Sequence, residues 1–268
     1  MNPFNPYDYV SLDGFGIMRG VTLALPSGQV SGVLPPGVVL GAQSVTPPGT
    51  HPVIVLFNRI LGAHMSVPTL LPSLTYHELS VGVPFCYVTG TDTVRPGQGP
   101  FYFQPRLYLD SVLATAGGVF YWGFAKSMAS FEVSEDAYVV RSTEGEVLST
   151  LEVQSRGAFR CIADMPAFGA VRRMHDQPLL STLPLGMGPL PVCSSFDKNW
   201  DAGTIAPLET VARIGDALVP GLHVGRVPAS GFSTGIDGSV LGAYEMRLPW
   251  RLSMPYPPPA SSLMQRTI

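Results

Sequence analysis

Glycine and proline recur along the entire chain, and this restricts the fold more than any other feature of the sequence. The 268 residues include 29 glycines and 27 prolines, which divide the chain into short pieces instead of gathering in one linker. Proline interrupts helices, whereas turns rich in these two residues commonly join short strands. Because 46% of the residues are hydrophobic, the chain has the apolar mass that disordered chains lack. We therefore expect a mainly β fold, a barrel or sandwich with one to three helices.

Period-two alternation identifies the clearest strands. In residues 129–153, Phe131 and Val133 and then Tyr138 and Val140 alternate with polar residues between charged turns. This pattern is typical of an antiparallel meander with one solvated face. The expected strands span residues 20–25, 52–57, 76–83, 87–89, 118–124, 129–133, 137–142, 147–153 and 243–251.

Two segments favour helices. Residues 110–117 form the first. Residues 207–217 form the second, because apolar residues recur there at helical spacing. These apolar residues are Leu208, Val211, Ile214 and Leu218.

The chain is expected to form one domain between two extended ends. Residues 1–9 indicate an extended arm, residues 10–254 the domain, and residues 255–268 a proline-rich tail. No internal repeat and no low-complexity linker divides the central part.

Charge is sparse, and this argues against several classes of partner. The net charge is −3 with no basic stripe, so nothing favours nucleic-acid binding. Only 13% of residues are charged, about half the usual share. This predicts a surface made of loops rich in Gly, Pro and Ser, or one partly buried in a homo-oligomer. The N-terminus lacks the pattern of a secretory signal, and the uncharged run between Asp110 and Lys126 is too short to span a membrane. We expect a cytoplasmic protein with no membrane partner.

Cysteine and histidine give no sign of a metal or a cofactor. The three cysteines, Cys86, Cys161 and Cys193, match neither a zinc spacing nor a disulfide framework, which favours free thiols in a reducing cytosol. The five histidines show no metal-binding spacing, and no phosphate-binding glycine loop is present.

The segment GFSTG at residues 231–235 fits the pattern of a hydrolase nucleophile. That arrangement needs a histidine later in the chain, but the last histidine, His223, precedes Ser233. The hydrolase interpretation is therefore rejected.

A lone lysine in an apolar segment is the strongest chemical signal. The chain contains only two lysines, and one of them, Lys126, follows the uncharged segment GVFYWGFA. An ordinary lysine at a strand end keeps its ammonium group in water. A lysine held in an apolar pocket instead has a lowered pKa, and the neutral amine can attack a ketone to form a Schiff base. We therefore identify Lys126 as the candidate nucleophile.

A carboxylate for proton transfer is found in the segment LTYHELSVGVPF. Alternation puts Leu74, Tyr76, Glu78 and Ser80 on one face of the expected strand, and His77 on the other. A lone glutamate on a strand is most often a solvated residue. Its position beside Tyr76 makes Glu78 the candidate acid–base group.

These two segments together resemble the acetoacetate decarboxylase-like superfamily. GVFYWGFAK has the length of the family's G-R-E-x-x-G-[FY]-P-K motif and aligns Lys126 with the Schiff-base lysine. YHE at residues 76–78 aligns Glu78 with a catalytic glutamate, and VLPPGVVLG at residues 33–41 resembles a family loop. The resemblance implies a single-domain, cone-shaped, mostly antiparallel β-barrel with the lysine inside and no cofactor, often assembled as an oligomer. It also makes Arg19 the candidate for binding a substrate carboxylate.

The sequence departs from the family motif at positions that affect the chemistry. Ser127 stands where the decarboxylases have a second lysine, so activation of Lys126 would rest on desolvation alone. Val119 and Phe120 replace the motif's arginine and glutamate, and Asn58 stands where the family has another acidic residue. We expect Asn58 to contact substrate, together with four neighbours of the two motifs, namely Tyr76, Tyr121, Phe124 and Met128.

Three hypotheses follow. The first is a cofactor-independent Schiff-base lyase that decarboxylates a β-keto acid, or acts as an aldolase or dehydratase on a keto acid. The second is a barrel that binds an apolar small molecule without chemistry, favoured by Ser127 and Asn58. The expected partner is thus a small keto acid or an apolar carbonyl compound. The third is a structural subunit, which predicts no ligand-sized cavity around Lys126.

Overall fold

The computed structural model describes residues 10–67, 72–89, 98–165, 168–182, 191–218, 226–230 and 242–258. The expected arm at residues 1–9 lies outside the described residues, as do His223, the segment at 231–235 and the tail beyond residue 258. The division into arm, domain and tail stays a prediction.

Strands dominate the described residues. The helical elements are α1 (Ser27–Ser31), α2 (Val112–Trp122), α3 (Phe168–His175) and two 3₁₀ turns, η2 (Ile162–Asp164) and η4 (Trp200–Ala202). The strands are β1 (Ser11–Pro26), β2 (Val38–Leu40), β3 (Thr50–Met65), β4 (Leu74–Val88), β5 (Gln98–Leu109), β6 (Lys126–Met128), β7 (Ser130–Val133), β8 (Ala137–Arg141), β9 (Val147–Arg156), β10 (Arg160–Cys161), β11 (Leu179–Thr182), β12 (Pro191–Ser194), β13 (Phe196–Lys198), β14 (Thr204–Ile214), β15 (Arg226–Ser230) and β16 (Gly242–Ser253).

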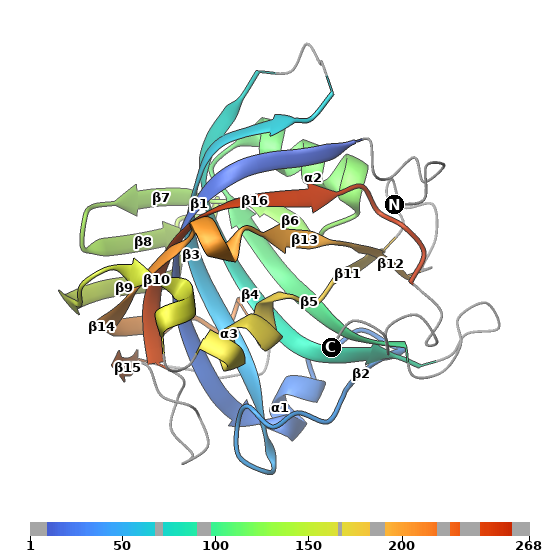
Figure 1. The fold of residues 1–268 in the computed structure, drawn as a ribbon, viewed down its shortest axis with the longest axis horizontal. Coiled ribbons are helices and arrows are strands. Elements are labelled where there is room, and N and C mark those ends of the chain that lie inside the picture. Colours follow the sequence, from blue (N-terminus) through green and yellow to red (C-terminus); the bar gives the residue numbers. More distant parts are fainter. Residues whose placement is uncertain are drawn as a thin grey trace.

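All these strands belong to one sheet. Its main path runs β12-β11-β5-β4-β3-β1-β16-β14-β9-β8-β7, and the other five strands pair with members of this path. Pairing is antiparallel except where β11 and β6 run parallel to β5. In Figure 1 the long strands converge near β1 and β16 and diverge toward β2 and β12. The expected mainly β class is confirmed, while closure of the sheet into a cone-shaped barrel stays an expectation.

The long antiparallel strands are the best-predicted elements. Segments 20–25, 52–57, 76–83 and 243–251 lie within β1, β3, β4 and β16. The meander is confirmed as β7, β8 and β9, which pair in sequence order. Apolar and polar residues alternate in this meander because one face of the strands is buried and the other is solvated.

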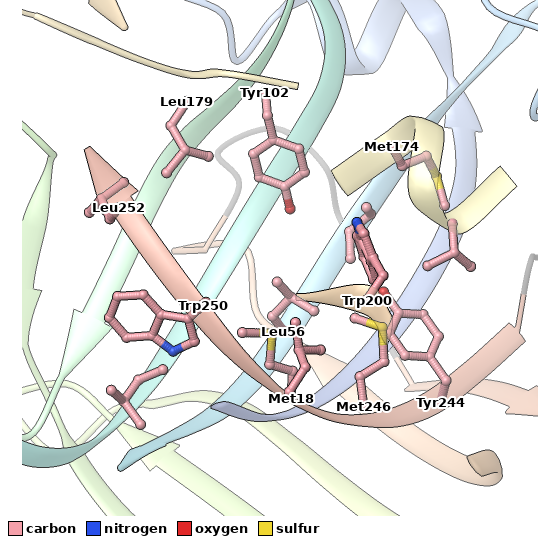
Figure 2. Packing of buried hydrophobic residues seen from close by; sticks show 14 of the residues in the cluster. Met18, Leu56, Tyr102, Met174, Leu179, Trp200, Tyr244, Met246, Trp250 and Leu252 are labelled. Carbon is pink, nitrogen blue, oxygen red and sulfur yellow. The ribbon is translucent and has the colours of Figure 1, made fainter. Parts of the chain in front are cut away.

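Alternating side chains divide the core between the two faces of the sheet. One face carries the cluster drawn in Figure 2, which includes Met18, Leu56 and Trp250. The other face carries Val21, Val55 and Leu151. Figure 1 shows α2 beside one end of the sheet and α3 across its middle.

The expected strand at residues 118–124 is wrong, because the helix expected at 110–117 continues to Trp122. Ser111 caps the helix by accepting a hydrogen bond from the Ala114 backbone N–H at 3.3 Å. Gly123 ends it in the left-handed conformation, with φ of 66°. Ala114, Gly118 and Trp122 are buried at a spacing of four residues. These caps and this buried stripe outweigh the strand propensity of the aromatic residues.

The expected helix at residues 207–217 is also wrong. The segment lies largely in β14, where Leu208, Thr210, Ala212 and Ile214 are buried at period two while Glu209 and Arg213 are exposed. The sequence does not show this alternation clearly, because two of the buried positions are occupied by a polar residue, Thr210, and a small one, Ala212. Pairing of β14 with β9 and β16 decides the conformation.

Within the described ranges, none of the helices has the length and hydropathy that a membrane crossing requires.

Candidate active site

Lys126 begins β6, directly after the turn that follows α2. It lies opposite Leu107 in the parallel pairing of β6 with β5, and its side chain extends beneath the helix. A Cβ atom at Gly118 would lie 2.4 Å from both Cδ and Cε of Lys126 and 2.8 Å from Nζ. Only glycine at position 118 therefore lets the lysine lie against the helix in this conformation.

The amine of Lys126 is nearly removed from water. Its side chain is 9% exposed, and its Nζ lies 5.9 Å from the centre of the Phe124 ring. Burial lowers the pKa of Lys126 below the ordinary value of 10.5, although the nearby Glu78 carboxylate opposes part of this effect. The lysine thus has the environment that increases the neutral fraction of an amine.

Glu78 is the carboxylate beside this amine. Its Oε2 lies 3.6 Å from Lys126 Nζ, and its Oε1 accepts a hydrogen bond from Asn58 Nδ2 at 3.3 Å. Asn58 faces Glu78 directly across the β3–β4 pairing. Burial, and then the charges of Glu78 and Asp110, raise the pKa of Tyr76, so the Tyr76 phenol stays protonated. The site pairs an amine with a carboxylate that is positioned by an amide.

A cavity of about 130 Å³ opens onto these groups. Its polar lining residues include Glu78, Gln104 and Lys126, and most of the rest are apolar. A cavity of roughly 150 Å³ can hold a molecule the size of benzene. The apolar wall is contributed by Leu12, Ile60, Ala63, Met65, Pro72, Leu74, Leu107, Leu113, Ala114, Gly117, Gly118, Trp122, Phe124, Leu179, Phe196, Trp250 and Leu252.

A smaller cavity of about 40 Å³ adjoins the first. The two share five lining residues, Ile60, Glu78, Gln104, Leu179 and Phe196. The smaller cavity adds Asn58, Tyr102, His175 and Lys198. Glu78 therefore lines both the cavity that contains Lys126 and the one that contains Lys198.

Six of the predicted site residues come together. Tyr76, Tyr121 and Phe124 line the cavity with Lys126 and Glu78. Asn58 lines the smaller cavity and contacts Glu78. His77 points to the opposite face, as expected, where its Nδ1 lies 2.8 Å from Asp110.

Met128 is near this group but does not line either cavity. It shares the short strand β6 with Lys126, and its sulfur accepts a hydrogen bond from the Thr115 hydroxyl at 3.2 Å. Met128 therefore supports α2 instead of facing the cavity.

Arg19 lies on the other face of the sheet. Its neighbour Met18 lines the smaller cavity, and alternation along β1 turns Arg19 away from it. The Arg19 Nε donates a hydrogen bond to Glu245 at 2.9 Å, and its guanidinium lies 5.2 Å from the centre of the Tyr138 ring. The geometry does not bring Arg19 together with Lys126, and its expected role in binding a substrate carboxylate stays a prediction.

Sequence reasoning missed four residues of the site: Gly118, Gln104, Tyr102 and Lys198. The glycine pair in ATAGGVFYW was a signal for Gly118, since two glycines inside a helix commonly mark a close contact. The rarity of lysine was a signal for Lys198. No pattern in the sequence indicated Gln104 or Tyr102.

No metal-binding arrangement of His, Cys, Asp and Glu occurs in the part of the chain that the structure describes.

No protein-family model and no curated protein matches the sequence. Solved structures do match. The enduracididine biosynthesis enzyme MppR, complexed with the condensation product of pyruvate and imidazole 4-carboxaldehyde, has a TM-score of 0.54 at 15% identity, with 91% of this chain and 87% of that chain covered.

Two further structures agree with this match. Acetoacetate decarboxylase from Legionella pneumophila has a TM-score of 0.53 at 14% identity, covering 92% of this chain and 85% of that chain. An acetoacetate decarboxylase-like enzyme from Sphingomonas wittichii RW1 has a TM-score of 0.53 at 14% identity, covering 93% and 94%. The likeness extends over nearly the whole chain, well beyond the two short motifs. The protein therefore has the acetoacetate decarboxylase-like fold.

Proposed function

We propose that this protein is a cofactor-independent Schiff-base lyase that acts on a small keto acid, with Lys126 as the nucleophile and Glu78 as the acid–base group. The observation that carries the proposal is the contact between a buried lysine and a carboxylate at 3.6 Å in an apolar cavity. Desolvation favours the neutral amine, and the carboxylate can exchange protons with the substrate. Perturbed titratable groups that meet in a cavity are typical of catalytic sites.

The chemistry follows from these two groups. The neutral Lys126 amine adds to the substrate carbonyl carbon, and the resulting carbinolamine loses water to form an iminium ion. The iminium accepts the electron pair of a neighbouring C–C or C–H bond when that bond breaks. In a decarboxylation CO₂ leaves; in an aldol or dehydration route Glu78 removes an α-proton. The carbon is then protonated or adds to a second carbonyl compound; in a dehydration, a β-hydroxyl group instead takes a proton and leaves as water. Hydrolysis of the final iminium restores the free amine.

The structural relatives support a keto-acid substrate. MppR has been solved with pyruvate, with a TM-score of 0.51 and 14% identity to this chain. Pyruvate has as many non-hydrogen atoms as benzene, so the cavity of about 130 Å³ suits a molecule of this size. The apolar wall also suits a small carbonyl compound with an alkyl substituent.

A non-catalytic binding role is the second candidate, and the lysine environment provides its support. Glu78 favours the charged form of Lys126, and Ser127 is exposed on the opposite side of β6. No second lysine therefore lies beside Lys126 to lower its pKa. The structural-subunit hypothesis predicted that no ligand-sized cavity adjoins Lys126, and the cavity of about 130 Å³ argues against it.

Borohydride trapping tests the proposal. We expect incubation with 2-keto acids, 3-keto acids and neutral ketones, followed by reduction, to add the mass of at least one ligand to the wild type and none to Lys126→Ala. Peptide mapping then assigns the modified lysine, which is simple because the chain has only Lys126 and Lys198. Absence of any adduct on Lys126, with a ligand still bound in a calorimetric titration, would favour the binding role.

A further inference from the structure

Lys198 is a second buried lysine next to the site, and the proposed chemistry does not use it. It ends β13 with only 8% of its surface exposed. Its Nζ donates hydrogen bonds to the backbone carbonyls of His175 at 2.6 Å and Phe196 at 3.2 Å. An ammonium group has three N–H donors, so one donor is left beyond these two bonds, with the Phe196 ring centre 4.2 Å from Nζ.

The groups around Lys198 suit an anion. Lys198 and Tyr102 both line the smaller cavity. The Tyr102 hydroxyl is fully buried and has no hydrogen-bond partner among the described residues. Figure 2 shows the Tyr102 ring directed inward from β5, with its hydroxyl pointing toward Leu56. A buried hydroxyl without a partner costs stability, and a ligand oxygen in this cavity would satisfy it.

Lys198 keeps its positive charge at neutral pH. Burial lowers its pKa to about 8, while Asp176 and Asp197 oppose the shift. The neighbouring His175 adds no charge, because burial and the nearby Lys198 lower its pKa to about 3. The cavity therefore contains a cation and a neutral hydrogen-bond donor at pH 7. Glu78 also lines this cavity, but its carboxylate already faces the Lys126 amine at 3.6 Å.

We propose that Lys198 and Tyr102 bind the carboxylate of an acid substrate whose carbonyl carbon reacts with Lys126, and that this carboxylate is retained in the product. The inference rests on the proposed function of Lys126. The two cavities share part of their lining, which includes Glu78, so Lys126 and Lys198 line adjoining cavities. In this proposal Lys198, and not Arg19, binds the substrate carboxylate.

An ion pair between Lys198 and the substrate carboxylate would favour aldol chemistry over decarboxylation. It stabilises the substrate carboxylate more than the neutral CO₂ that decarboxylation produces, so it would slow the loss of that group. The retained carboxylate points to aldol chemistry. Glu78 removes an α-proton from the iminium, the resulting enamine carbon forms a bond to an aldehyde carbon, and the aldehyde oxygen takes a proton. Hydrolysis then releases a larger keto acid and restores the Lys126 amine.

The experiment compares trapping rates at Lys126 for two ligand sets. One is a series of 2-, 3- and 4-keto acids, and the other contains neutral methyl ketones of matched size. Lys198→Met and Tyr102→Phe are compared with Tyr108→Phe. Tyr108 lies on the same strand but packs with the cluster on the other face of the sheet, so its variant is a matched control.

We expect Lys198→Met to lower the trapping rate for at least one keto acid by about tenfold to a hundredfold, since a hydrogen bond to a charged group is lost. Neutral ketones should react within about threefold of the wild-type rate, and Tyr108→Phe should resemble the wild type. The preferred acid should form no CO₂. If Lys198→Met does not fold, Tyr102→Phe gives the same comparison, because it removes only a hydroxyl without a partner.

Other outcomes are decisive as well. An unchanged ratio of acid to neutral rates in both variants would overturn the role of Lys198 while the Schiff-base function stands. Equal losses for both ligand sets would assign Lys198 a structural role and also overturn the inference. No wild-type adduct with either set would refute the Schiff-base function itself, and release of CO₂ from the preferred acid would overturn retention of the carboxylate.

Discussion

At the scale of single residues, Glu78 has two opposed effects on Lys126. It is the nearest described carboxylate, so it can move protons, but its charge also raises the pKa that burial lowers. In the proposed function, Glu78 therefore opposes formation of the neutral Lys126 amine that would attack a carbonyl. Because Glu78 raises the pKa of Lys126, removal of its charge should lower that pKa.

We expect Glu78→Gln to shift the pH profile of borohydride trapping at Lys126 to lower pH. Removal of the negative charge lets the pKa of Lys126 fall further, so the neutral amine is present at lower pH. Turnover should nevertheless drop by about 10²- to 10⁴-fold, because the proton-transfer group is lost. Asn58→Asp adds a carboxylate beside Glu78 and should shift the profile the other way. A profile that stays unchanged in both variants would contradict the electrostatic coupling.

At the scale of elements, α2 lies against the side chain of Lys126. The Trp122 Nε1 donates a hydrogen bond to the Ser253 carbonyl at 2.8 Å, which ties the end of the helix to the end of β16. Gly118 faces the stem of Lys126 from the middle of the helix. The helix therefore acts as a rigid wall against which the lysine lies.

We expect Gly118→Ala to lower the rate of adduct formation at least tenfold while the melting temperature stays equal or rises. The new Cβ would displace the flexible end of Lys126, whereas alanine favours a helix over glycine by about 0.5–1 kcal/mol. Gly117→Ala is the matched control, because its Cβ would have no heavy atom within 4 Å. Equal trapping rates in the two variants, measured beside calorimetric melting curves, would show that the close contact has no role.

At the scale of the whole molecule, the buried histidine His175 links α3 to the sheet. Its Nε2 lies 2.8 Å from the Tyr244 hydroxyl on β16, and its pKa is lowered to about 3 by burial and Lys198. The unfolded chain, with an ordinary pKa near 6.5, takes up a proton that the native protein does not. Stability contributed by neutral His175 is therefore lost as the pH falls from about 6.5 toward 3.

We expect the free energy of unfolding, measured in urea, to fall between pH 7 and pH 4, with His175 contributing of order 3 kcal/mol. His175→Gln should be less stable than the wild type at pH 7, because a buried contact is lost, but its stability should depend less on pH. An equally steep loss in both proteins would assign the acid sensitivity to other groups.

Assembly also belongs to this scale, and the homo-oligomer stays a prediction from the low charge content. Of the described residues, the exposed large hydrophobic ones are concentrated in α2, with Val112 at 68% and Leu113 at 53% exposure. Exposed apolar surface of this kind commonly marks an interaction site.

The sequence by itself determined the fold class, the long strands and the two central residues of the site. Lys126 and Glu78 could be found because their chemistry is local: a charge among apolar residues, and a carboxylate in an alternating strand. The structure brings them within 3.6 Å. Their catalytic roles stay predictions.

Only the tertiary structure decided the rest, because those features depend on partners distant in sequence. Residues 207–217 lie largely in a strand because they pair with β16. Arg19 contacts Glu245 on the face of β1 that is opposite the cavity. The contact of Gly118 with Lys126, and the approach of Lys198 to the cavity wall that contains Glu78, join segments with no common local pattern. Periodicity reports which face of an element is buried, but the neighbour that covers this face is chosen by the packing of the whole chain.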